Sequence, residues 1–259
     1  MRETIIEQID DYVAIITFNR PQQKNAFNTR MYDEAADALL IAQESPRIGA
    51  VVLTGAGDAF SAGQDLGEMA TLATHGSKEP HGFPRFMDRL CQFDKPLLAA
   101  VNGVGVGIGF TMLLQCDLVY FSTTARLRAP FLPLGVVPEA ASSYLLPVVV
   151  GWQHAAEILL TADWIDATRA VAMGIGRAVH EPTALLPAAL TMAHKIAAQP
   201  PGATQATKRL LIGTRSEQIR AARAREDAVF AERVGNDENM EAVTAFLQKR
   251  TPDFSRFRE

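Results

Sequence analysis

The sequence predicts an α/β protein in which a β/α core over residues 1–200 is followed by an α-helical region over residues 201–259. Short apolar runs typical of buried parallel strands lie between segments with helical periodicity. That alternation implies βαβ units with right-handed crossovers. After about residue 181 the strand signals stop and helical patterns remain. A chain of 259 residues is long enough to bury a large core.

The first half of the chain contains the strand signals. Residues 5–9 and 12–18 alternate apolar with polar or small residues around Asp10-Asp11, which predicts a β-hairpin. Thr29 resembles an N-cap for a helix that extends to about Gln43. Continuous apolar runs predict three buried strands, at 50–53, 97–101 and 118–121.

The second half is predicted to be helical, with breaks at 199–202 and 235–237, where Pro, Gly, Asn and Asp gather. The expected helices lie at 183–199, 203–213, 216–234 and 238–249. Residues 72–84 mix Gly, Pro, His and charge without periodicity, so we expect a mobile loop there. Trp152 and Trp164 flank an apolar helical stretch and are expected in the core.

Composition and charge exclude several functional classes. The net charge of −4 and the pI near 5.8 give no sign of the positively charged surface that binds nucleic acid or an anionic membrane. No apolar run reaches the roughly 18 residues of a membrane helix, and the start has no signal-peptide pattern, so we expect a cytoplasmic protein. Its two cysteines lack a CxxC spacing. The histidines show no metal-binding spacing, and His75 and His81 are expected to face solvent.

Two glycine-bearing segments are the candidates for chemistry, at 53–66 and 101–110. Each reads as a buried strand, a turn of small residues and the start of a helix. Such a turn lets the backbone approach a ligand, and the helix start offers unpaired N–H groups to a phosphate or a developing oxyanion. A dinucleotide fingerprint fails because Phe110 occupies the third glycine position, and no Walker A sequence is present. Tight helix–strand packing is the alternative role for these glycines.

Several ordered motifs resemble the crotonase (enoyl-CoA hydratase/isomerase) superfamily over residues 4–257. They are Asn19-Arg-Pro21, Asn25-Ala-Phe27, Phe60-Ser-Ala-Gly-Gln-Asp-Leu66, Lys95-Pro96 with Ala99-Ala-Val-Asn-Gly103, Cys116-Asp117 and Ala245-Phe-Leu-Gln-Lys249. The resemblance implies a spiral core of ββα repeats with two roughly perpendicular sheets. It also implies C-terminal helices that form a homotrimer or a hexamer built as a dimer of trimers.

The resemblance further implies an acyl-CoA substrate, with coenzyme A as part of the substrate and no separate cofactor or metal. The two oxyanion-hole N–H groups would belong to Gln64 and to Ile108, where the family usually has glycine. Two such donors stabilise an enolate more than its neutral precursor, which is what accelerates a reaction. The expected substrate-binding residues are Lys24, Ala26, Ala62, Asp65, Leu66, Phe246 and Lys249. Asp65 also reads as the cap of a helix that begins near Leu66.

The carboxylates distinguish the reactions of this superfamily. The two glutamate positions of a hydratase fall on Thr111 and Phe131, which we expect to line the substrate site without acting as bases. Glu139, in Leu134-Gly-Val-Val-Pro-Glu-Ala-Ala-Ser-Ser-Tyr144, resembles the catalytic glutamate of the Δ3,Δ2-enoyl-CoA isomerase branch. It is also a residue type that commonly opens a helix. The sequence favours isomerisation, with hydration or another enolate reaction and a non-catalytic acyl-CoA-binding protein as alternatives.

Overall fold

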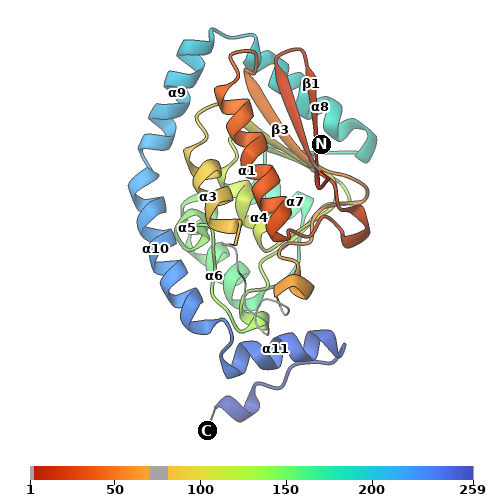
Figure 1. Ribbon diagram of the computed structural model, residues 1–259, viewed down its shortest axis with the longest axis vertical. Helices are drawn as coiled ribbons and strands as arrows, with labels where there is room; N and C mark the ends of the chain where they lie inside the picture. The colour runs from red at the N-terminus through yellow and green to blue at the C-terminus, as the bar shows by residue number, and fades with distance from the viewer. Residues whose placement is uncertain (1–2, 70–80, 259) are drawn as a thin grey trace.

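The computed structural model describes residues 3–69 and 81–258, and this part of the chain forms two β-sheets with helices around them (Figure 1). The larger sheet has the order β1-β2-β3-β5-β7-β10 and the smaller one the order β4-β6-β8-β9. The β1–β2 and β8–β9 pairs are antiparallel, and the other pairs are parallel. The larger sheet contains β1 (Ile5–Asp10), β2 (Val13–Phe18), β3 (Ala50–Gly55), β5 (Leu97–Val101), β7 (Leu118–Ser122) and β10 (Ala178–His180). The predicted α/β class is confirmed.

The predicted hairpin and the three predicted buried strands are present as β1–β2, β3, β5 and β7. Helix α1 (Thr29–Glu44) connects β2 to β3, and its N-cap is Asn28. The Asn28 side chain accepts a hydrogen bond from the Met31 N–H at 2.9 Å. The prediction of Thr29 as the cap is therefore wrong by one residue, because Asn28 supplies the oxygen that a cap needs.

The smaller sheet was not predicted from local patterns. It consists of β4 (Ala59–Ser61), β6 (Val104–Val106), β8 (Arg126–Arg128) and β9 (Ile165–Asp166). Strands of two or three residues are too short to show an alternation of apolar and polar residues. Three of them directly follow a long strand in the chain: β4 follows β3, β6 follows β5 and β8 follows β7. The chain thus passes from one sheet to the other at each repeat, and the glycine-bearing segments lie at these crossings.

Helices cover the two faces of the larger sheet. On one face, α8 (Pro182–Ala197) packs Leu185, Ala189 and Ala193 against residues of β2, β3, β5 and β7. The other face holds the main core, with α1, α3 (Phe83–Gln92) and a cluster of aromatic rings. The Phe18 ring lies 5.0 Å from that of Phe27 and 5.3 Å from that of Phe60. Phe60 belongs to this core and lies on β4, directly before the first glycine-bearing turn.

The remaining helices fall into two groups: the first four lie between strands of the core, and the last three form the predicted C-terminal region. They are α4 (Ile108–Thr111), α5 (Ser142–Val150), α6 (Trp152–Thr161), α7 (Ala167–Ala172), α9 (Pro201–Gly213), α10 (Ser216–Arg233) and α11 (Asp237–Leu247). In Figure 1, α9 and α10 run along one side of the core and α11 lies below it. The 201–259 helices agree with prediction to within about two residues, whereas a domain boundary at residue 200 stays a prediction. No helix in the described ranges is long and apolar enough to cross a membrane.

Two expectations for surface segments need correction. Residues 72–80 of the expected loop, including His75, lie outside the described residues, and Phe83 and Pro84 begin α3 instead of ending a loop. Trp152 is 73% exposed and Trp164 is 37% exposed, so neither is a core residue. The guanidinium groups of Arg126 and Arg128 lie over the Trp164 ring, which explains its position outside the core.

An ion pair with a buried lysine attaches the C-terminal helices to the core. The Lys208 ammonium on α9 lies 2.6 Å from the Asp117 carboxylate, which also accepts a hydrogen bond from the Leu97 N–H at 2.8 Å. The Lys208 side chain is 5% exposed and that of Asp117 is 25% exposed. The pair therefore stabilises the junction of α9 with β5 and β7.

We expect Lys208→Met to lower the free energy of unfolding by about 2 kcal/mol, between the values for exposed and for fully buried pairs. Urea denaturation measures this change. Arg169→Met is the matched control, because Arg169 and Glu157 form a pair in which both side chains are at least 40% exposed. Its expected cost is much smaller, because water and salt screen an exposed pair. Equal costs for the two variants would contradict the anchoring role of Lys208.

Candidate active site formed by two glycine turns and Glu139

The first glycine turn directs the N–H of Gln64 away from its neighbouring segment. Gln64 forms an isolated parallel bridge with Phe27. The Phe27 N–H donates to the Gly63 carbonyl at 2.7 Å, and the Asp65 N–H donates to the Phe27 carbonyl at 2.8 Å. In a parallel bridge of this kind, the N–H of the residue between those two groups points to the opposite side. Gly63 has φ +89°, and a Cβ there would lie 2.6 Å from the Val106 carbonyl oxygen, so glycine is required.

The second glycine turn ends at the start of α4. Gly107 has φ 53° and ψ −123°, and Ile108 is the first residue of the helix. The first N–H groups of a helix have no partner within it. The Ile108 side chain is 1% exposed and belongs to the main core, which fixes the direction of its backbone. Gly109 allows close packing, because a Cβ there would lie 2.5 Å from the Ser61 carbonyl oxygen.

The two turns lie against each other. Strands β4 and β6 are parallel neighbours, with Ala59 opposite Val104 and Ser61 opposite Gly105. A Cβ placed on Gly107 would lie 4.0 Å from the Gly63 Cα. Gln64 and Ile108 each follow one of these glycines, so their N–H groups belong to one short stretch of surface. Among the described residues, neither N–H has a hydrogen-bond acceptor. The arrangement suits an oxygen atom that gains negative charge.

Glu139 stands immediately before α5, in a turn where Ala140 and Ala141 both adopt positive φ, at 60° and 61°. The Glu139 carbonyl accepts hydrogen bonds from the Ser142 N–H at 2.9 Å and the Ser142 hydroxyl at 2.6 Å. Burial, followed by the negative charges of Glu226 and Asp227, raises the pKa of Glu139 to about 8. A carboxyl group with such a pKa can both accept and donate a proton near neutral pH.

Tyr32, on α1, is hydrogen-bonded to the first turn and is influenced by the charge of Glu139. Burial raises the pKa of Tyr32 well above its ordinary value, and the negative charge of Glu139 contributes to that rise. The Tyr32 hydroxyl donates to the Gln64 side-chain oxygen at 3.0 Å. The charge of Glu139 therefore acts on a hydroxyl that is hydrogen-bonded to the Gln64 side chain, although the two residues come from different repeats.

The two expected hydratase positions are occupied by Thr111 and Phe131, and neither side chain is a carboxylate. Thr111 is fully buried, and its hydroxyl and its N–H both donate to the Gly107 carbonyl, at 3.2 and 2.8 Å. Phe131 is 5% exposed and precedes the short helix η3 (Leu132–Leu134). Thr111 is thus held against the second turn, and Phe131 belongs to the main core. Their contact with a substrate stays a prediction.

The structure brings five of the seven expected coenzyme A residues together. The Ala62 N–H donates to the Lys24 carbonyl at 2.8 Å, and Ala26 lies two residues from Lys24 in a buried position. The Asp65 carboxylate caps the helical residues 66–69, beginning at Leu66, by accepting from the Gly67 and Glu68 N–H groups at 3.1 and 3.2 Å. Arg20 lies 2.9 Å from that carboxylate.

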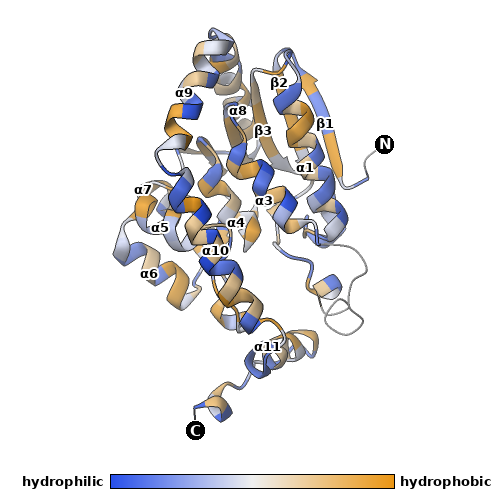
Figure 2. Ribbon diagram, turned by 60° about the vertical axis from the view of Figure 1, so that its left-hand side comes forward, coloured by the Kyte–Doolittle hydropathy of each residue, from blue (hydrophilic) through white to orange (hydrophobic). Residues whose placement is uncertain are grey.

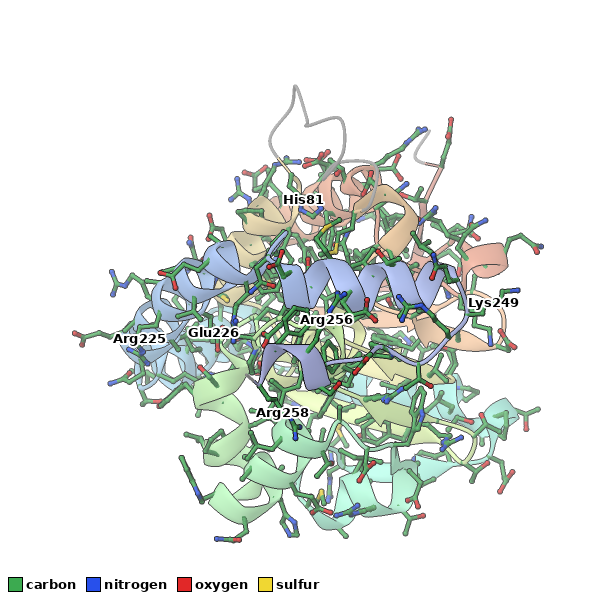
Figure 3. All side chains as sticks on the ribbon, turned by 90° about the horizontal axis from the view of Figure 1, so that it is seen from below. His81, Arg225, Glu226, Lys249, Arg256 and Arg258 are labelled. Carbon is green, nitrogen blue, oxygen red and sulfur yellow. The ribbon has the colours of Figure 1, made fainter. Side chains whose placement is uncertain are left out.

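Phe246 and Lys249 come from the end of the last α-helix of the chain and the residues that follow it. Phe246 is 56% exposed on α11, and Lys249 is exposed just beyond that helix. Figure 3 shows Lys249 at the outer end of α11. Helix α11 packs on η3, where the Asn239 side chain donates to the Leu134 carbonyl at 2.7 Å. A role for either residue in binding coenzyme A stays a prediction.

Sequence reasoning overlooked Tyr32 and Glu226 and misplaced His81. His81 is partly buried: its ring lies 5.3 Å from that of Tyr32, and its Nε2 lies 3.5 Å from the Gln64 side-chain nitrogen. Burial lowers the pKa of His81. The expectation that it faces solvent is wrong, because α3 packs its first turn on α1. Across the described ranges, no group of histidine, cysteine and carboxylate side chains could hold a metal ion.

Known proteins resemble this chain along almost its whole length. The sequence model described as enoyl-CoA hydratase/isomerase matches residues 8–256. The chain is 35% identical to the 2,3-dehydroadipyl-CoA hydratase of Escherichia coli, over 98% of this chain and 99% of that protein. It is 34% identical to the human enoyl-CoA delta isomerase 2, over 96% of this chain and 64% of that longer protein.

Solved structures also resemble the chain over nearly its whole length. The enoyl-CoA hydratase/isomerase of Pseudoalteromonas atlantica has a TM-score of 0.92 at 38% identity, covering 98% of this chain and all of that one. The OdaA protein of Pseudomonas aeruginosa has a TM-score of 0.89 at 36% identity, covering 95% and 99%. Hydratases and an isomerase thus resemble the chain to a similar degree, and overall similarity leaves the branch open.

Proposed function

Because the chain belongs to the enoyl-CoA hydratase/isomerase family, it catalyses a crotonase-type reaction on an acyl-CoA, and we propose that this reaction is the isomerisation of a 3-enoyl-CoA to a 2-enoyl-CoA. The observation that carries the choice is the carboxylate inventory. Glu139 has a raised pKa, and its charge acts on Tyr32, which is hydrogen-bonded to Gln64. Thr111 and Phe131, in contrast, stand at the positions where a hydratase would need carboxylates.

In the proposed reaction, the Glu139 carboxylate removes a proton from C2 of the acyl chain. The C–H bonding electrons move toward the thioester, and negative charge develops on the carbonyl oxygen. The N–H groups of Gln64 and Ile108 donate to that oxygen and stabilise the enolate. The proton then passes from Glu139 to C4, and the double bond shifts from C3–C4 to C2–C3. The net reaction gains and loses no atom, so one base is sufficient.

Hydration would require more than this site contains. A water molecule must be activated on one side of the double bond while a proton is delivered on the other, which two carboxylates perform in a hydratase. The buried Phe131 side chain and the hydrogen-bonded Thr111 hydroxyl can do neither. The raised pKa of Glu139, about 8, matches the two-way proton transfer that isomerisation needs.

The coenzyme A moiety is proposed to bind along the segments that meet at Ala62. Lys24 is exposed, and its backbone lies against Ala62. Its ammonium group could therefore reach the phosphates of coenzyme A from solvent without a desolvation cost. Ala26, Asp65 and Leu66 would line the adjoining surface, and Phe246 and Lys249 would complete it from α11.

We propose that the chain assembles as a homotrimer or as a dimer of such trimers. Large apolar side chains are exposed on α5, α6 and α9, and Figure 2 shows hydrophobic residues on the outer surfaces of α6 and α9. The residues are Val148, Trp152, Leu160, Leu210 and Leu211, each at least 61% exposed. Contact with further copies of the chain would remove this surface from water.

Turnover of matched substrates tests the proposed reaction. We expect the purified protein to convert 3-enoyl-CoA esters to 2-enoyl-CoA faster than it hydrates 2-enoyl-CoA esters of the same chain length. Ultraviolet absorbance of the conjugated thioester follows both reactions, since isomerisation creates the conjugation and hydration removes it. Hydration without isomerisation would refute the proposal. Binding of both esters without turnover of either would identify a non-catalytic acyl-CoA-binding protein.

A further inference from the structure

A buried carboxylate on α10 holds the turn that carries Glu139. The Glu226 side chain accepts hydrogen bonds from the Ala141 N–H at 2.7 Å and from the Ser143 N–H at 2.8 Å, one with each oxygen. Glu226 is 6% exposed. Figure 3 shows it on the inner side of α10, whereas its neighbour Arg225 lies at the outer edge. This carboxylate therefore caps α5 from a distant segment, since Ala141 has no side-chain oxygen with which to cap the helix itself.

The turn between Glu139 and α5 needs such external support. Ala140 and Ala141 are both left-handed, which costs each of them about 1 kcal/mol or more, since neither is glycine. Two charge-assisted hydrogen bonds to one buried carboxylate are strong enough to hold this conformation. The Gln115 side chain contacts the Ala140 carbonyl at a longer 3.4 Å. Ser142 holds the Glu139 carbonyl within the turn, and Glu226 supplies the support that comes from outside it.

From this geometry we propose that Glu226 is a positioning residue for Glu139: it fixes the turn and places a second negative charge behind the base. The proposal rests on the function assigned to Glu139 above. The position of Glu226 is otherwise costly, because burying a carboxylate is unfavourable unless it is well hydrogen-bonded. A neutral side chain could cap α5 with one acceptor. A carboxylate supplies two acceptors and a charge.

The charge acts on the proton affinity of Glu139. Among the described residues, the titratable groups that interact electrostatically with Glu139 are Glu226 and Asp227 from α10 and Tyr32 from α1. Burial is the largest cause of the raised pKa of Glu139, about 8, and the charge of Glu226 is the next. The acidic limb of kcat/KM, which reports the free enzyme, is therefore expected near pH 8 in the unaltered protein. Removing the Glu226 charge lowers the pKa of Glu139 and moves this limb to lower pH.

Three variants separate the cap from the charge. Glu226→Gln loses the charge and one acceptor, so we expect kcat to fall by about 10- to 100-fold, as for a base displaced by about 1 Å, and the limb to move to lower pH. Glu226→Asp keeps the charge but shortens the reach, so kcat falls while the limb stays. Asp227→Asn removes an exposed charge on the same helix without touching the turn, so kcat at high pH stays unchanged and the limb moves slightly to lower pH.

Isomerase kinetics from pH 5.5 to 9.5, with thermal melts at each pH, provide the measurement. Folded Glu226→Gln protein with an unchanged kcat, or with the limb at its original pH, would overturn the proposal. If that variant does not fold, Glu226→Asp decides: an unchanged kcat overturns the positioning role. Retained activity of Glu139→Gln would instead refute the function of Glu139 itself. The two failures are therefore distinguishable.

Discussion

Glu139→Gln is expected to reduce isomerase turnover by roughly 10²- to 10⁴-fold, the usual contribution of a positioned general base. The amide has nearly the shape of the carboxylate but cannot take a proton from C2. Affinity for a saturated acyl-CoA, which binds but does not react, should stay within about threefold of the original value. Steady-state kinetics with a 3-enoyl-CoA and calorimetric binding of the saturated ester measure the two effects.

The melting temperature of this variant shows whether it is folded, and the direction of its change can be predicted. The pKa of Glu139 is about 8 in the folded protein, against 4.5 for an ordinary glutamate. The folded state thus binds an extra proton between these pH values, and stability falls as the pH rises through that window. Glutamine lacks this loss, so Glu139→Gln should melt no lower than the unaltered protein at pH 9. Glu232→Gln, an exposed change on α10, is the control and should keep full turnover.

Ile108→Pro is expected to lower kcat by about 10²- to 10³-fold, the typical effect of removing one oxyanion-hole donor. Proline removes the N–H of the first residue of α4 while suiting that helical position. The preceding Gly107 has no Cβ to clash with the proline ring. The variant therefore deletes a donor and leaves the path of the backbone intact.

Ile108→Ala is the matched control, because it loses the buried side chain but retains the N–H. Both variants should be less stable, since the Ile108 side chain is 1% exposed in the main core. Only the proline variant should lose most of its kcat when both are assayed well below their melting temperatures. An equal loss in the two variants would show that packing, and not the N–H, is what Ile108 contributes. That result would remove Ile108 from the oxyanion hole.

Local patterns of the chain predicted much of the fold. The hairpin at β1–β2, the buried strands β3, β5 and β7, and the helices α8 to α11 follow from apolar periodicity and from breaks at Pro and Gly. Such patterns are local, because the apolar face of a helix or strand is determined by residues a few positions apart. They do not indicate which other element packs against that face. Trp152 was therefore expected inside and is 73% exposed.

The sequence by itself determined the chemical inventory: two glycine turns, one glutamate before a helix, and no carboxylate at residues 111 and 131. The tertiary structure decided their arrangement. It paired strands β4 and β6, which are too short to recognise, and so brought Gly63 against Gly107. It also placed Glu226 on the turn of Glu139, 85 positions beyond Ala141 in the chain. Contacts between residues so far apart in the chain depend on how helices and strands pack together, and local residue preferences do not determine that packing.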